Sequence, residues 1–160
     1  MRSILVDAGP LIALLDRSDR NHRGVKGNLE RNRCRLLTTW PVLAEACHFM
    51  PERTQIRFLR WAASGGLNVI ELHETALATI ADWKEKYRDL PMDLADASLL
   101  WIAEHTGITE ILTFDMRDFS AYRLPNGKAL VPSERNLRTR LPPRVSDGKR
   151  VSACRTRSSP

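Results

Sequence analysis

The apolar residues of this chain fall into short runs that alternate with longer amphipathic segments. The short runs of apolar and β-branched residues predict strands at residues 4–6, 35–38, 67–70, 110–113 and 129–131, and the first of these is typical of a buried strand. The longer segments predict helices at residues 9–15, 22–32, 40–50, 54–64, 74–87 and 93–104. Strands that alternate with helices predict a mostly parallel sheet with helices on both faces, which is a three-layer α/β/α sandwich.

Single residues mark several of the predicted helix ends. Pro10 is tolerated in a first turn, and Thr39 is a candidate N-cap for the helix that follows it. Gly65 and Gly66 end the fourth predicted helix, and Gly107 is placed to end the last one.

Composition and charge predict one domain and a tail. With 160 residues and 42% hydrophobic content, the chain can bury the core of one domain. Residues 133–160 hold eight basic side chains against Glu134 and Asp147, which accounts for the whole net charge of +6. This segment has no aromatic residue and is rich in Arg, Ser and Pro, a composition typical of disorder. We expect a domain over residues 1–132 and a basic, disordered tail over residues 133–160.

Several classes of protein are excluded by the composition. No apolar run approaches the roughly 18 residues of a membrane span, so we expect no membrane association. Asp7 comes too early for the apolar region of a signal peptide. Cys34, Cys47 and Cys154 are too few and too scattered for a disulfide scaffold or a zinc site. Reduced thiols in a cytoplasmic protein fit this pattern better.

Two acidic residues lie at the predicted carboxyl ends of strands. Asp7 ends the first strand, and Asp115 follows the fourth. Functional groups collect at this edge of open parallel sheets, so the two carboxylates face one crevice if these strands are neighbours. Each also has a structural explanation: Asp7 as a cap or Asx turn, and Asp115 as part of a turn over residues 114–118.

Glu45 lies in the helix predicted over residues 40–50. Val42, Ala46 and Phe49 are spaced to form one apolar face of this helix. Glu45 is three residues after Val42 and four before Phe49, so it borders that face and does not oppose it. The structural alternative is that Glu45 lies at the rim of this apolar face, where its carboxylate reaches solvent or pairs with a nearby basic side chain.

Asp93 and Asp96 lie three residues apart at the start of the last predicted helix. Asp93 is well placed to cap the N–H groups of the first turn. Asp96 has apolar neighbours on nearly every side, since residues 97–103 are apolar except for Ser98. A carboxylate in such a helix is costly unless it is paired or ligated. Interaction with the helix dipole is the structural alternative for Asp96.

Together these carboxylates favour a hard divalent cation. Two carboxylates about 4 Å apart repel by about 4 kcal/mol at an effective dielectric near 20. Four converging acids therefore take up protons or need a cation, and oxygen ligands select Mg²⁺ or Mn²⁺ over zinc. Such a site can hold a phosphodiester oxygen and activate a water molecule for attack. No His pair or Cys cluster accompanies the acids, so zinc hydrolysis and cysteine catalysis have no support.

Four segments of the chain resemble the PIN domain family, specifically the small toxin ribonucleases of the VapC type. The segments are residues 4–16, 43–45, 92–99 and 112–119. Each segment is a weak match alone, but four in this order and spacing form a specific pattern that extends over about residues 4–131. The tail after Pro132 is longer than these toxins usually have.

The resemblance implies an α/β/α sandwich with endoribonuclease activity that depends on Mg²⁺ or Mn²⁺. The catalytic and metal-binding acids of the family match Asp7, Glu45, Asp96 and Asp115. Glu45 would bind the metal directly or through water, while Thr113 and Asp93 match accessory positions. The resemblance also implies a homodimer, an RNA substrate and a small antitoxin protein whose tail enters the acidic groove.

An acidic groove repels RNA, so basic residues at its rim must supply phosphate contacts. Arg17, Arg20 and Arg23, which follow the first predicted helix, are candidates, and solvated loop charges are the alternative for each of them.

Other functions fit the sequence less well. A phosphatase of the haloacid-dehalogenase type needs a second Asp where Gly9 stands. The sequence has no Gly-rich phosphate loop, so nucleotide binding has no support. A catalytically silent PIN-like module that binds RNA or a partner is the alternative from another class. A nuclease that processes RNA outside toxin–antitoxin systems would use the same chemistry.

Overall fold

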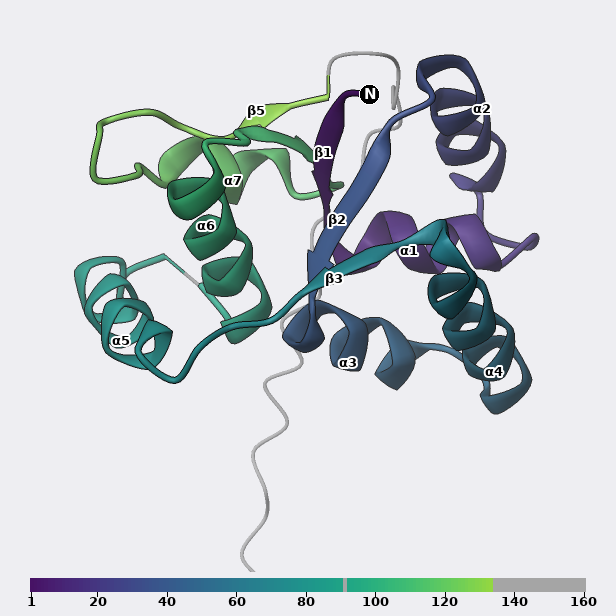
Figure 1. Ribbon diagram of the computed structural model, residues 1–160, viewed down its shortest axis with the longest axis horizontal. Helices are drawn as coiled ribbons and strands as arrows, with labels where there is room; N and C mark the ends of the chain where they lie inside the picture. Colours follow the sequence, from purple (N-terminus) through teal and green to yellow (C-terminus); the bar gives the residue numbers. More distant parts are fainter. Residues whose placement is uncertain (91, 134–160) are drawn as a thin grey trace, which may run out of the picture.

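The computed structural model describes residues 1–90 and 92–133. Within these residues, five parallel strands form one sheet in the order β3-β2-β1-β4-β5 (Figure 1). The strands are β1 (Ser3–Val6), β2 (Arg35–Thr39), β3 (Asn68–Ile70), β4 (Glu110–Leu112) and β5 (Val131–Pro132). The order of the strands reverses between β1 and β4, and ligands of open α/β sheets bind at such a switch point.

Helices cover both faces of the sheet, so the predicted three-layer α/β/α sandwich is confirmed. The helices are α1 (Ala8–Leu15), α2 (His22–Asn32), α3 (Trp40–Phe49), α4 (Glu52–Trp61), α5 (Ala76–Lys86), α6 (Leu94–Thr106) and α7 (Met116–Ala121). In Figure 1, α2 and α4 lie to one side of the strands, and α5, α6 and α7 lie to the other. Helix α3 lies below the carboxyl ends of β1 and β2, which places it at the edge that holds the switch point.

The apolar runs of β1, β2 and β4 form the core, whereas the edge strands β3 and β5 are half-buried or exposed. Ile4, Leu5 and Val6 of β1 are each at most 1% exposed, because β1 lies in the middle of the sheet with helices on both faces. Helix α6 is buried on several sides at once, since it packs against α3, α5 and β2. This explains why its sequence is apolar nearly all round and not amphipathic.

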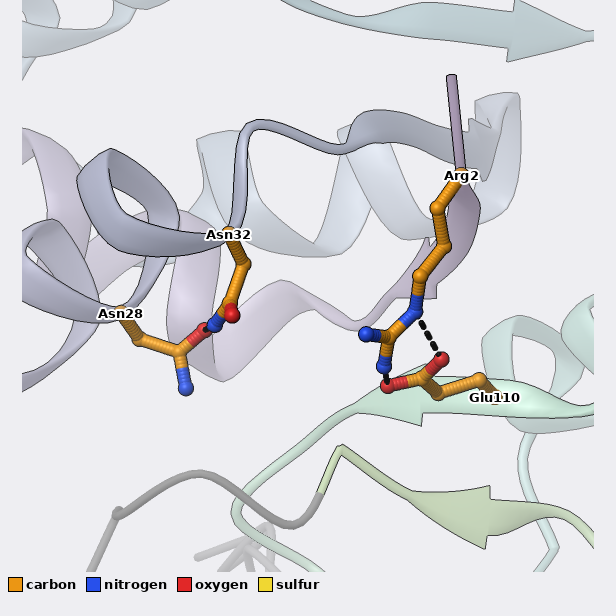
Figure 2. A network of polar contacts seen from close by, with 4 residues as sticks. All are labelled: Arg2, Asn28, Asn32 and Glu110. Atoms are coloured by element: carbon orange, nitrogen blue, oxygen red, sulfur yellow. Dashed lines mark hydrogen bonds and ion pairs between the residues drawn. The ribbon is translucent and has the colours of Figure 1, made fainter.

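Polar contacts also join elements away from the carboxyl edge. At the amino end of the sheet, Arg2 forms a bidentate ion pair with Glu110 of β4 (Figure 2). Arg2 Nε donates to Glu110 Oε2 at 2.6 Å. On α2, Asn32 Nδ2 donates to Asn28 Oδ1 at 2.8 Å. The Arg2 side chain is half exposed, so the ion pair fixes geometry more than it adds stability.

Helix α7 was not predicted; a turn over residues 114–118 was the structural alternative considered for Asp115. The fourth helix differs as well, because α4 begins at Glu52 and is followed after Trp61 by a π-helical turn over Ala62–Gly66. A Cβ atom on Gly66 would lie 2.2 Å from Trp61 Cε2, so the close approach of the chain to the indole requires glycine. Gly107 ends α6 in the left-handed region with a φ of 71°, as predicted.

Thr39 precedes α3 as predicted, but its side chain does not cap the helix. Thr39 Oγ1 instead lies 2.6 Å from Ser98 Oγ of α6, and both side chains are fully buried. Ser98 Oγ donates its proton to Ala95 O at 2.7 Å, so the Thr39 hydroxyl is the donor to Ser98. This hydroxyl pair joins the end of β2 to α6.

The last described residue continues the sheet. Ser133 N donates to Ile111 O at 2.8 Å, so the pairing with β4 extends to the first residue of the predicted tail. The rest of that tail, residues 134–160, lies outside the described residues. Within the described part of the chain, no helix is long and apolar enough to cross a membrane.

The buried hydroxyl pair predicts an asymmetric response to substitution. Ser98→Ala leaves the Thr39 hydroxyl without its acceptor, which should lower the free energy of unfolding by about 1–3 kcal/mol. Thr39→Val should cost less, because Ser98 keeps its bond to Ala95 O. Urea unfolding of the two variants and of the double variant measures this. The double variant should lose less than the sum of the single losses, and additive losses would contradict the assigned direction of the bond.

Candidate active site

Asp7 lies at the junction of β1 and α1, at the carboxyl edge of the sheet. Its Oδ1 accepts from Ala8 N at 2.7 Å, and it is the N-cap residue of α1. Its backbone N donates to Leu112 O at 3.0 Å, which joins the end of β1 to the end of β4. The capping role expected as an alternative for Asp7 is therefore present. This capping bond uses only Oδ1, so the second carboxylate oxygen, Oδ2, can interact with another residue.

That group is Thr113, the residue directly after β4. Thr113 Oγ1 donates to Asp7 Oδ2 at 2.8 Å and accepts from Asp115 N at 2.9 Å. Thr113 is only 4% exposed, so its hydroxyl is held between these two partners. Because β1 and β4 are neighbours, the condition for Asp7 and Asp115 to face one crevice is met.

Asp115 is the N-cap residue of α7. Its Oδ1 accepts from Asp118 N at 3.4 Å. The turn proposed for residues 114–118 is thus the start of a short helix. Asp118 lies in its first turn and brings a further carboxyl group to this region, which sequence reasoning missed.

Asp93 and Asp96 occupy the start of α6. Asp93 caps the helix as predicted, since its Oδ1 accepts from Asp96 N at 2.8 Å. Asp93 is exposed, whereas Asp96 is only 8% exposed. A carboxyl group at this depth is costly in its charged form unless a partner compensates for the lost water.

The pKa of Asp96 indicates which acidic residues lie near it. Its pKa is raised to about 8, first by burial and then by the negative charges of Asp93 and Asp7, with a smaller contribution from Glu45. These groups come from the starts of α6 and α1 and from the middle of α3. The carboxyl edge therefore gathers acids that are distant in sequence around one buried carboxyl group.

Glu45 is half-buried on α3, next to Ala46, which is fully buried together with Val42. The apolar face predicted for α3 is wrong at Phe49, whose side chain is 64% exposed. Phe49 is the last residue of α3, and its ring contacts the exposed His48 ring at a centroid distance of 5.1 Å and not the core. Glu45 still borders the buried face, but that face is shorter than expected.

Tyr122 forms part of the wall of the site, and the sequence analysis did not identify it. It follows α7 and is fully buried, in edge contact with the rings of Tyr87 and Phe119. Its pKa is raised, first by burial and then by nearby acids in the order Asp96, Asp118, Asp115 and Asp93. The spacing of Phe119 and Tyr122, three residues apart after Asp115, is the sequence signal for this aromatic cluster.

The acids lie in one region but do not form a preformed ligand set. Among residues 1–90 and 92–133, no three His, Cys, Asp or Glu side chains are arranged to hold a metal ion. Like charges keep apart unless a proton or a cation lies between them. The assignment of Asp7, Glu45, Asp96 and Asp115 as catalytic and metal-binding residues stays a prediction.

The fold and the site together define an α/β sandwich with acidic residues gathered at its switch point. Residues 4–124 match the model of the PIN domain, and the chain belongs to the PIN domain family. The chain is 26% identical to ribonuclease VapC26 of Mycobacterium tuberculosis over 124 residues, which cover 75% of this chain and 92% of that protein.

A solved structure agrees with this family. The crystal structure of VapC20 from Mycobacterium tuberculosis, described as a toxin that cleaves the sarcin-ricin loop, superposes with a TM-score of 0.65. The two chains are 20% identical, and the match covers 72% of this chain and 92% of VapC20. The expected resemblance to PIN proteins of the VapC type is confirmed.

The raised pKa of Asp96 predicts a pH-dependent stability. The pKa of the Asp96 carboxyl group is about 8 in the folded chain, against an ordinary value of 3.8 for an aspartate in the unfolded chain. Between these values the folded state binds a proton that the unfolded state releases, so the free energy of unfolding should fall as pH rises from about 4 to 8. Asp96→Asn should weaken this dependence and stabilise the chain at pH 8 more than at pH 5. Urea unfolding at the two pH values, with EDTA present, measures the effect.

The control is Asp82→Asn, which removes an exposed carboxylate of α5. This variant should keep the pH dependence of the unsubstituted chain. An unchanged dependence in Asp96→Asn would show that Asp96 is ionised in the folded state at neutral pH.

Proposed function

We propose that this protein is an endoribonuclease that depends on Mg²⁺ or Mn²⁺ and acts as the toxin of a type II toxin–antitoxin system. Its membership of the PIN domain family and its likeness to VapC26, named a ribonuclease, support nuclease activity. The observation that carries the proposal is the buried Asp96, whose pKa is raised by burial and by Asp93, Asp7 and Glu45. A site that collects negative charge around a buried carboxyl group favours a proton or a cation there.

The residues at this edge fit a hard divalent cation. Asp7, Glu45, Asp96 and Asp115 offer only carboxylate oxygens, the ligands that Mg²⁺ and Mn²⁺ prefer. Asp7, Asp96 and Asp115 would hold the ion, with Glu45 bound directly or through water. When bound, such an ion polarises the scissile phosphate and lowers the pKa of a water molecule. In-line attack would leave a 5′-phosphate and a 3′-hydroxyl group.

Neighbouring residues support these acids. The Thr113 hydroxyl fixes the orientation of Asp7 and the position of Asp115 N. Asp93 holds the first turn of α6, and so the backbone of Asp96, by accepting from Asp96 N. The rings of Tyr122, Tyr87 and Phe119 pack together on the buried side, and a site that excludes water strengthens every charge interaction within it.

The proposal includes an RNA substrate, a cognate antitoxin protein and a homodimer, and it places the protein in the cytoplasm. VapC20 is described as a toxin that cleaves the sarcin-ricin loop, which makes a structured RNA the first substrate to test. Equilibrium sedimentation at micromolar concentration tests the dimer, and a monomer alone would overturn that part of the proposal.

Cleavage of RNA by the purified chain tests the central claim. An end-labelled structured RNA should be cut in the presence of Mn²⁺ and remain intact in EDTA. Asp7→Asn should lower the rate by more than about 100-fold, because loss of even a supporting partner of a metal ligand typically costs 10–100-fold. Gel analysis of the labelled products measures the rate and identifies the new ends.

The matched control is again Asp82→Asn on α5, which should cleave at the unsubstituted rate. The preparation must be free of antitoxin, as checked by mass spectrometry. Cleavage that persists in EDTA would overturn the metal dependence. Absence of cleavage with every structured RNA tried would favour the silent binding module.

Thr113 provides a finer test of the same site. Thr113→Val removes the donor to Asp7 Oδ2 and should lower kcat by about 10–100-fold. Thr113→Ser keeps the hydroxyl and should retain most of the activity. Both variants should keep the thermal stability needed for assay at 25 °C. Equal activity of the Val and Ser variants would contradict a role for the hydroxyl group.

A further inference from the structure

The C-terminal end of α5 contacts the segments next to both Asp96 and Asp115, although none of the acids proposed for the site lies on α5. Helices α5, α6 and α7 lie on the same side of the sheet (Figure 1). Helix α5 packs on α6, whereas α7 packs mainly on β5. In the described part of the chain, α6 and α7 are not among the pairs of elements in extensive contact. A link between these two helices would therefore help to fix the separation of Asp96 and Asp115.

Lys84 forms the first of these contacts. From the last turn of α5, its Nζ donates to Met92 O at 2.5 Å, and Met92 is buried. Within residues 1–90 and 92–133 the Lys84 ammonium forms no ion pair, so this carbonyl oxygen is the group that orients it. A hydrogen bond from a charged donor is roughly twice as strong as one between neutral groups.

The Lys84 contact lies next to the residues that position Asp96. Asp93 directly follows Met92 and holds the first turn of α6 through two bonds. Its Oδ1 accepts from Asp96 N at 2.8 Å, and its O accepts from Ala97 N at 3.2 Å. A shift of Met92 would therefore move the cap of α6, and with it the backbone of Asp96.

Tyr87, the residue at the end of α5, forms the second contact. Its hydroxyl accepts from Arg123 N at 2.9 Å and donates to Arg123 O at 3.3 Å, so it holds both backbone groups of one residue. The Arg123 guanidinium turns back and donates to Tyr122 O at 2.9 Å. The rings of Tyr87 and Tyr122 are in edge contact at a centroid distance of 5.3 Å. Tyr87 thereby fixes the segment that follows α7.

Tyr122 connects this second contact to the acids. Its backbone N donates to Asp118 O at 3.3 Å, and its buried ring has Asp96 as the acid with the largest effect on its raised pKa. Lys84 and Tyr87 are three residues apart, so they lie on one face of α5. From this face they reach two segments that are distant in sequence and that both lie close to Asp96.

We propose that Lys84 and Tyr87 are positioning residues of the acidic edge, which hold the start of α6 and the end of α7 at a fixed separation. The inference rests on the proposed function, because this separation affects the reaction only if Asp96 and Asp115 act on the same ion. A displacement of about 1 Å caused far from the reacting atoms can cost about 100-fold in rate. Both residues act through the backbone of other residues, and neither is a catalytic residue.

Hydrogen–deuterium exchange of the full chain in EDTA tests the two contacts without metal or RNA. Lys84→Met should speed exchange at residues 93–97 roughly tenfold, because the cap of α6 loses a hydrogen bond that holds it from outside. Tyr87→Phe keeps the ring and should speed exchange of Arg123 N to a similar extent, since this N–H loses its acceptor. Exchange in β1 should stay unchanged in both variants. An equal rise in β1 would indicate a general loss of stability, and that result or unchanged exchange at both segments overturns the proposal.

Two further variants are the controls. Lys84→Arg keeps a charged donor and should leave exchange at residues 93–97 close to that of the unsubstituted chain. Lys128→Met removes the same charge from an exposed residue of the loop before β5, whose side chain has no hydrogen bond or ion pair with another described residue. It should change neither exchange nor cleavage. Faster exchange at residues 93–97 in Lys128→Met would show that the loss of charge alone is responsible, and the role of Lys84 would be overturned.

Cleavage of RNA in Mn²⁺ separates positioning from RNA binding. A positioning role predicts that Lys84→Met and Tyr87→Phe each lower kcat about tenfold and leave KM within about twofold. Lys84→Arg should restore most of the lost kcat. If KM rises while kcat is kept, Lys84 contacts the RNA and the proposal fails.

The Lys84→Met/Tyr87→Phe double variant tests whether the two residues act together. It should lose little more kcat than the poorer single variant, because either substitution already frees the separation that both residues fix. Losses that multiply would indicate two independent contacts and would overturn the shared role. If the unsubstituted chain cleaves no RNA, the proposed function fails, whereas the exchange measurement still decides whether the two segments are held.

Discussion

The acidic edge of this protein depends on the pairing of β1 with β4, two strands separated by about 100 residues of sequence. At the carboxyl end of this strand pair, Asp7 N donates a hydrogen bond to Leu112 O. The Thr113 hydroxyl donates a second one to Asp7 Oδ2. Glu45 and Asp96 reach the site on α3 and α6, which pack on each other and on the neighbouring strand β2. A sheet with another strand order would leave the same carboxylates apart, so the topology is a condition of the chemistry.

The layer architecture could be predicted from the sequence because it follows from local patterns. Buried parallel strands read as continuous apolar runs, and β1 and β4 are such runs. The role of Asp93 as a cap was also predictable, since capping is decided within one turn of helix. The burial of Asp96 was predictable for a different reason: a helix that is apolar on nearly every side has no solvent-facing position for it.

The parts that could not be predicted depend on contacts between distant segments. Thr39 has the right identity and position for a cap, yet its hydroxyl donates to Ser98, because α6 lies within reach only in the folded chain. Phe49 matches the spacing of the apolar face, yet α3 ends there and the ring stays exposed. Helix α7 is six residues long, so the three-residue spacing of Phe119 and Tyr122 is its only helical signal, and the burial of Tyr122 near the acids was missed.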